Sequence, residues 1–164
     1  MPIKKGILVA TGLALMLVAF CAKPDSTAEG SKGDGSMSSQ SVDKSMTEIA
    51  WIKEDYKQAL AKADADGKLL MIDVYTDWCG PCKMMDKDTF PQKEVVDKAA
   101  NFVSLKIDAE KGQGPEVAKK FNVEGFPTIL FVDGKGNLVH SIIGLHEPAD
   151  FVAEMDKALD KRAG

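Results

Sequence analysis

The sequence predicts an α/β domain in which a mixed central sheet carries helices on both faces. From residue 69 onward, apolar runs of strand length and helix-forming segments follow in the order strand, helix, strand, helix, strand, strand, helix. Two of the strand runs, 69–75 and 128–132, are almost continuously apolar, as strands buried on both faces are. Alternation of this kind predicts helical layers packed on one sheet.

Three elements are predicted before residue 76. Residues 49–52 form a short strand. Residues 54–65 (EDYKQALAKADA) contain helix formers, with apolar side chains at helical spacing. Residues 69–75 (LLMIDVY) form a buried strand that is interrupted only by Asp73.

The middle of the chain is predicted to hold two helices around a second strand. Residues 83–100 can form a helix, with a break near Pro91, because proline removes a helical hydrogen bond and clashes with the preceding turn. Residues 102–107 read as a strand and residues 115–121 as a short helix.

The last elements are predicted to be a hairpin and a helix. The strand at 128–132 is followed by residues 133–137 (DGKGN), which are dense in turn formers. They join it to a strand at 138–143, and such a connection predicts an antiparallel hairpin. An amphipathic helix covers residues 148–159.

The chain divides into a leader, a tether and one folded unit. Its 164 residues suit one domain with some extra chain, which excludes a two-domain enzyme. We predict a signal peptide at 1–21, a disordered tether at 22–46 and a folded domain at 47–164. The tether is rich in Ser, Gly, Asp and Lys, so it has little to bury and stays flexible. It lets an anchored domain reach its partners, or it is only a spacer.

The leader ends at a cysteine. Two lysines near the start precede residues 6–20, which hold no charge. A basic start followed by roughly 7 to 15 apolar residues is typical of a secretory leader, whereas a spanning helix needs about 20. The segment LVAFC, which closes at Cys21, resembles the lipobox of bacterial lipoproteins, although Val18 and Phe20 are not its usual residues. The resemblance implies that Cys21 is lipidated. Ordinary signal-peptidase cleavage near residues 19–22 and an uncleaved anchor are the alternatives.

Composition excludes several classes of protein. A formal net charge of -4 and a sequence pI near 5.2 leave no excess of basic residues for nucleic-acid binding. With 28% charged and 45% hydrophobic residues, the chain is neither a disordered polyanion nor a membrane bundle. Its 3 cysteines are too few for a disulfide-stapled miniprotein, and the odd number gives one of them a separate role.

The segment Trp78-Cys79-Gly80-Pro81-Cys82 directly follows a predicted buried strand and opens a predicted helix. At that junction, unpaired backbone N–H groups and the positive end of the helix dipole favour a thiolate at Cys79. A thiolate is the attacking species in disulfide exchange. Cys82, one turn along, is placed to attack a mixed disulfide at Cys79, and Pro81 suits the first turn of the helix.

The cysteine pair has three other possible interpretations. Half of a zinc site needs a second pair of ligands, for which only Cys21, His140 and His146 remain. Attachment of c-type haem needs histidine after the second cysteine, where Lys83 stands. A purely structural disulfide is possible, but so short a ring stabilises a fold little by loop closure.

From about Ile49 to Leu159 the chain resembles thioredoxin-fold proteins. Besides WCGPC, an aspartate six residues before the first cysteine, Asp73, matches the buried aspartate of that family. The resemblance implies that Asp73, through water, takes the proton of Cys82 as it attacks. A charge inside LLMIDVY costs several kcal/mol if it is unpaired, so we expect a raised pKa. The alternative is a strand aspartate that reaches solvent.

The same resemblance implies a surface for client proteins. Residues 125–128 (GFPT) match the family's loop with a cis proline at Pro127, where the backbone of Phe126 pairs with an extended client segment. Trp78 supplies an apolar lip beside the cysteines, and Gly144 lets a partner approach closely. Gly80 and Pro81, between the cysteines, belong to the same surface. A core tryptophan and an ordinary turn glycine are the alternatives for Trp78 and Gly144.

Two further segments narrow the resemblance. Residues 75–79 and 83–90 are similar to the periplasmic carboxyl-terminal domain of the transmembrane thiol-disulfide reductant conductor, and to small thioredoxin-like lipoproteins. Lys87 stands where cytosolic thioredoxins usually have a kinking proline. Ser104 stands where that family keeps a lysine in the following strand, and Lys106 lies nearby.

The sequence therefore predicts an exported, lipid-anchored thiol-disulfide oxidoreductase that reduces protein disulfides and needs no metal or organic cofactor. Its expected partners are disulfide-bearing client proteins and a membrane electron conductor that reduces the pair again. Its expected location is the cell envelope, facing the periplasm and anchored through Cys21. The alternatives are an oxidase or isomerase on the same fold, and a binding module without catalysis.

Overall fold

The computed structural model describes residues 47–163. A five-stranded sheet has the order β1-β3-β2-β4-β5; β1, β3 and β2 run parallel, and β4 and β5 are antiparallel to their neighbours. The predicted mixed sheet and antiparallel hairpin are confirmed. The elements are β1 (Trp51–Lys53), α1 (Tyr56–Asp66), β2 (Leu69–Tyr75), α2 (Gly80–Met84), the π-helix η1 (Met85–Thr89), α3 (Lys93–Ala99), β3 (Phe102–Asp108), α4 (Gly114–Lys120), β4 (Thr128–Val132), β5 (Leu138–Ile143) and α5 (Pro148–Ala163).

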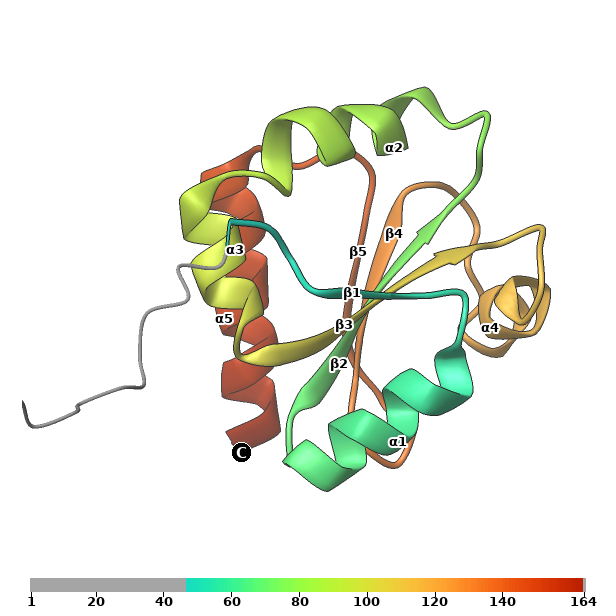
Figure 1. Ribbon diagram of the computed structural model, residues 1–164, viewed down its shortest axis with the longest axis vertical. Helices are drawn as coiled ribbons and strands as arrows, with labels where there is room; N and C mark the ends of the chain where they lie inside the picture. Colours follow the sequence, from blue (N-terminus) through green and yellow to red (C-terminus); the bar gives the residue numbers. More distant parts are fainter. Residues whose placement is uncertain (1–46, 164) are drawn as a thin grey trace, which may run out of the picture. The chain divides into compact units, whose positions relative to one another are not determined.

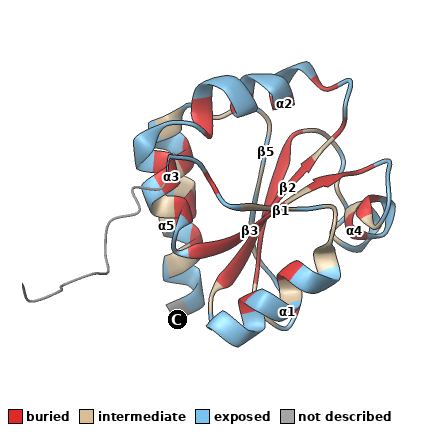
Figure 2. Ribbon diagram, in the orientation of Figure 1, coloured by how far each residue is buried: buried red, intermediate tan, exposed pale blue. Residues whose placement is uncertain are grey.

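Helices cover both faces of the sheet, as predicted (Figure 1). Successive side chains of a strand point to opposite faces. Leu69 and Met71 of β2 accordingly join a core with η1, α3 and α5, and Leu70 and Ile72 join a second core with α1 and α4. The central strands are buried along most of their length (Figure 2). β2 therefore lies between two helical layers, and its carboxyl end leads into the segment that contains the two cysteines.

The strands at 69–75, 128–132 and 138–143 have the predicted bounds. The first helix begins later than predicted, at Tyr56. Glu54 has a left-handed backbone (φ 60°), and the Asp55 side chain accepts a hydrogen bond from the backbone N–H of Gln58. This N-cap fixes the start of the helix.

The predicted helix at 83–100 is three segments, and its bounds were wrong. It begins at Gly80 as α2, widens into η1 and resumes as α3 after Gln92. The N–H of Phe90 bonds the carbonyl of Met85 at 2.9 Å, five residues back, as in a π turn. The predicted break near Pro91 is confirmed.

No helix within residues 47–163 is both long and apolar enough to cross a membrane. The predicted leader, the tether and Cys21 lie outside the described residues. Their roles stay predictions.

Candidate active site

The two cysteines lie where β2 passes into α2. Cys79 is the N-cap of α2 and forms a disulfide with Cys82, with 5.3 Å between their Cα atoms. The backbone N–H of Cys82 donates to Sγ of Cys79 at 3.1 Å. Both residues are buried. The helix thus directs a backbone donor at the first sulfur, the environment that favours a thiolate when the bond is reduced.

An exposed aromatic side chain stands beside the pair. Trp78 is 66% exposed, so the alternative of a core tryptophan is wrong. Its ring packs edge-on against Phe126, with 5.9 Å between centroids, and its indole N–H donates to Oε2 of Glu110 at 3.1 Å. Met84, at the end of α2, is also exposed. Exposed apolar side chains such as these are available for contact with a partner.

The loop before β4 joins this surface. The bond between Phe126 and Pro127 is cis, as predicted. The backbone N–H of Gly144 donates to the carbonyl of Pro127 at 2.8 Å, which holds the end of β5 against the loop. Gly144 has φ +92°, a conformation that L side chains rarely adopt. The structure therefore brings Trp78, Phe126, Pro127 and Gly144 together at one end of the sheet.

Asp73 is buried in β2, with 1% of its surface exposed. The alternative in which it reaches solvent is wrong. Its neighbour in the parallel register is Lys106 of β3, whose Nζ lies 2.5 Å from Oδ2. Burial raises the pKa of Asp73, as expected, although the lysine opposes that shift. Among the described residues none donates a hydrogen bond to its other oxygen, Oδ1.

Lys106 links this aspartate to η1, the π-helix that directly follows α2. Its Nζ also lies 2.6 Å from Oδ1 of Asp86 in η1 and 4.7 Å from the centre of the Tyr75 ring. Burial acts to lower the pKa of Lys106, but the two carboxylates outweigh burial and raise it. The lysine is therefore charged, and it ties β2, β3 and η1 together.

The model of the thioredoxin-like domain family matches residues 56–159, a range that holds both cysteines, Asp73 and the cis-proline loop. The chain belongs to this family.

Curated relatives of this thioredoxin-like chain are thiol:disulfide interchange proteins. The protein DsbD of Pseudoalteromonas atlantica is 37% identical over 110 residues, which are 65% of this chain and 19% of the relative. DsbD of Vibrio cholerae is 44% identical over 95 residues, 57% of this chain and 16% of the relative. The chain thus spans less than a fifth of the length of these relatives.

Solved structures share the fold. A candidate disulphide-isomerase from Bacteroides thetaiotaomicron has a TM-score of 0.62 and 35% identity, covering 70% of this chain and 95% of that one. The carboxyl-terminal domain of DsbD from Neisseria meningitidis, in its reduced form, has a TM-score of 0.58 and 24% identity, covering 65% of this chain and 99% of that one. The protein therefore has a thioredoxin-like domain in which Cys79 and Cys82 form a CxxC-type pair.

The thioredoxin-like site holds charged residues that sequence reasoning did not place. Ser104 occupies the position at which the family keeps a lysine, and it lies opposite Met71. Lys106, two residues later, forms the ion pair with Asp73 instead. Asp86 was missed. Its spacing of four residues from Cys82 was the available signal, because side chains at that spacing share a helix face.

The two histidines lie in other contacts. Nε2 of His140 is 2.6 Å from Oε2 of Glu154, and Nδ1 of His146 is 3.1 Å from the carbonyl oxygen of Gly144. Within residues 47–163, no three His, Cys, Asp or Glu side chains gather as a metal site would require.

Proposed function

We propose that this chain is an exported, lipid-anchored reductase of protein disulfides. The observation that carries the proposal is the placement of Cys79: it caps α2, it receives a backbone N–H, and the exposed ring of Trp78 stands beside it. That placement supplies a stabilised thiolate and an apolar surface on which a client can dock. The Gly80-Pro81 pair between the cysteines resembles that of reducing family members.

The proposed reaction is two successive exchanges. In the reduced protein, the Cys79 thiolate attacks one sulfur of a client disulfide, so a mixed disulfide forms and one client thiolate leaves. The Cys82 sulfur then attacks Sγ of Cys79. The second client thiol is released, the client has gained two electrons, and the protein holds the disulfide seen here.

Asp73 is proposed to receive the proton of Cys82 in the second exchange. Burial raises the pKa of this carboxyl, which brings it nearer to the range in which a base is effective at neutral pH. Oδ1 is the oxygen proposed to accept the proton, because Lys106 occupies Oδ2. Lys106 and Asp86 position this base and do not react.

Clients are proposed to lie in an extended conformation across the cis-proline loop. The backbone of Phe126 pairs with the client, Pro127, Gly80 and Pro81 form the floor, and Gly144 leaves room for it. Main-chain pairing depends little on the side chains of the client, so many disulfide-bearing proteins are acceptable clients.

The electrons are proposed to come from a membrane electron conductor. The sequence similarity to DsbD supports a place in such a relay, and a lipid at Cys21 would keep the domain at the membrane. A mass measurement of the mature N-terminus tests the anchor, because an unmodified Cys21, or a mature start beyond it, rejects the lipid.

Insulin reduction by the wild type, Cys79→Ser and Cys82→Ser proteins tests the catalytic proposal. We expect both variants to lose turnover and Cys82→Ser to accumulate a mixed disulfide with clients. Equal activity in all three proteins indicates a binding module. A measured reduction potential well above about -180 mV, toward strong oxidants, would replace the reductase with an oxidase or isomerase.

A further inference from the structure

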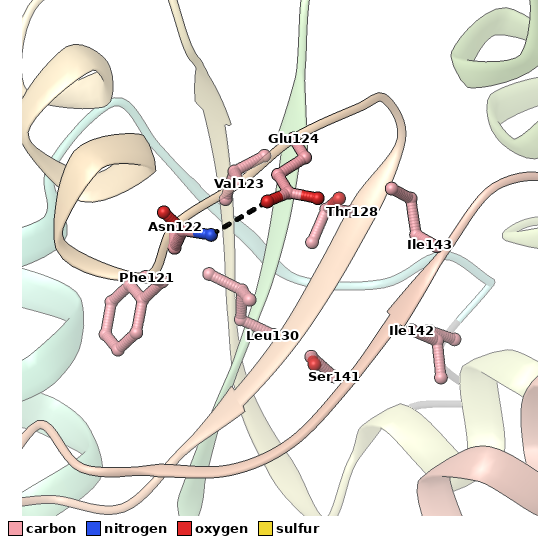
Figure 3. Close-up of a pocket in the computed structure, with 9 residues that line it drawn as sticks. All are labelled: Phe121, Asn122, Val123, Glu124, Thr128, Leu130, Ser141, Ile142 and Ile143. Carbon is pink, nitrogen blue, oxygen red and sulfur yellow. Dashed lines mark hydrogen bonds between the residues drawn. The ribbon is translucent and has the colours of Figure 1, made fainter.

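A small cavity lies where the loop after α4 meets β4 and β5, beside the cis-proline loop (Figure 3). Its volume is about 200 Å³. Pockets for organic cofactors usually have at least about 300 Å³, so this one suits a single side chain. Its lining residues are Phe121, Asn122, Val123, Glu124, Thr128, Leu130, Ser141, Ile142 and Ile143.

The cavity continues the surface proposed for clients. Glu124 directly precedes the loop, and Ile143 directly precedes Gly144. A Cβ placed on Gly125 would lie 3.0 Å from Cδ1 of Ile143, so the two walls nearly touch there. Ile143 is 58% exposed, which leaves an apolar wall open between the loop and the cavity. A chain segment that crosses Phe126 therefore passes the mouth of the cavity.

One charge and several apolar walls define the chemistry of this cavity. Glu124 alone among the nine lining residues is ionisable. Asn122, which has a left-handed backbone (φ 52°), donates to its Oε1 at 3.1 Å. This bond, the only one of the Glu124 side chain within the described residues, leaves Oε2 open to a second donor. Figure 3 shows the carboxylate between Asn122 and Thr128, above Leu130.

We propose that this cavity is a client subsite for a lysine or arginine side chain near the reactive cysteine of the client. Such a side chain lays its aliphatic stem along apolar walls and keeps its charged head at the polar rim. Leu130, Phe121 and Ile143 supply the walls, and Glu124 supplies the counter-charge. The subsite rests on the proposed function, because it needs a client segment across the cis-proline loop.

Reduction of small peptide disulfides tests the subsite. Lysine, N-acetyl-lysine or glutamate is placed in turn at each position within four residues of the cysteine, and kcat/KM is measured for the reduced protein. At one or two positions we expect lysine to exceed acetyl-lysine about three- to fivefold, the size of a partly exposed ion pair, and glutamate to be slowest. The preference should shrink as salt rises.

Two matched variants test whether Glu124 causes the preference for lysine. Glu124→Gln should abolish the preference and leave the rate for the acetyl-lysine peptide unchanged. Glu94→Gln removes the same charge from an exposed site on α3, outside the cavity, and should keep the preference. Equal kcat/KM for the three peptides at every position, or the same preference in Glu124→Gln, overturns the subsite while the reductase proposal stands.

Binding to the oxidised protein gives a readout without catalysis. A lysine peptide in which serine replaces the cysteine is titrated while backbone amide chemical shifts are followed. We expect shifts at Asn122, Glu124 and Ser141 that are absent with the acetyl-lysine peptide and in Glu124→Gln. If these shifts occur but no peptide disulfide is reduced, the subsite holds and the reductase proposal fails. Shifts confined to other residues overturn the subsite.

Discussion

Two lysines of this domain each lie between two carboxylates, but at different depths. Lys106, whose side chain is 15% exposed, lies between Asp73 and Asp86. Lys111, at 59%, lies between Asp108 and Asp77. Burial raises the pKa of Asp73 despite its lysine. At Asp108 burial acts in the same direction, but Lys111 and the N–H of Glu110 outweigh it and lower the pKa.

The difference shows that ion pairing alone does not set the protonation of a carboxyl. Three aromatic rings surround Lys106, those of Trp51, Tyr75 and Phe90, and keep water from the pair. Lys111 and Asp77 lie largely in solvent. Breaking an ion pair that has little water around it costs much free energy, and so does ionising its carboxyl. An ion pair in solvent changes the free energy of unfolding little.

The largest expected effect comes from removing the buried cation. Lys106→Met leaves the Asp73 carboxyl without its partner, so we expect a loss of about 3 kcal/mol in the free energy of unfolding at neutral pH. Urea denaturation measures it. Lys111→Met is the matched control, because it makes the same change at an exposed lysine. The buried partner of that lysine, Asp108, keeps the hydrogen bond from the N–H of Glu110. Equal losses in the two variants would show that the burial of the lysine does not determine the loss of stability.

Asp73→Asn separates the chemical role of the buried carboxyl from its effect on stability. Without the base, we expect client reduction at neutral pH to slow about a hundredfold while the mixed disulfide at Cys79 accumulates. Quenched single-turnover reactions show which exchange has slowed. A slower first exchange, with the second unchanged, contradicts the proposed proton transfer.

The raised pKa of Asp73 determines how the free energy of unfolding depends on pH. The folded protein holds the Asp73 proton more tightly than the unfolded chain, so this carboxyl costs stability as pH rises from about 4 through its raised pKa. Asp73→Asn should therefore gain stability relative to wild type over that window and match it below. Unfolding curves from pH 3 to 8 give the difference, and a constant offset would exclude the titration of Asp73.

Asp86→Asn is expected to have an intermediate effect. It leaves the Asp73 pair in place but removes the outer carboxylate from Lys106, so we expect a loss of about 1 kcal/mol or less. Asp88→Asn, in the same π-helix and exposed, controls for the change of charge. If Asp86→Asn matches that control in thermal melts, Asp86 does not hold the lysine.

The smallest expected effect belongs to Lys111→Met. At physiological salt and neutral pH we expect a loss of only a few tenths of a kcal/mol in its unfolding free energy, because the lysine is hydrated. As pH falls through the lowered pKa of Asp108, even this small difference between the two proteins should vanish. The lowered pKa of Asp108 contributes stability that is lost as pH falls through it, and the variant lacks part of that contribution.

Much of the fold and part of the site could be predicted from the sequence. Apolar runs predicted the bounds of β2 and β4, and the turn formers at 133–137 predicted the hairpin that contains β5. An aspartate inside an apolar run predicted the burial of Asp73. The ion pair between Asp73 and Lys106 could not be predicted in this way, because it depends on the register of two parallel strands far apart in the chain. No residue pattern in the sequence indicates the π turn at residues 85–89. The place of Asp86 beside Lys106 could therefore not be predicted either.

The bond between Gly144 and Pro127 bears on how long a bound client would stay. Proline has no N–H, and its carbonyl already accepts from Gly144, so main-chain pairing with a client stops at Phe126. Few backbone bonds mean a fast dissociation rate. Under the proposed function, residence on the protein is then governed by the covalent mixed disulfide. Once Cys82 resolves that bond, little remains to hold the product, and the domain is free for its next encounter.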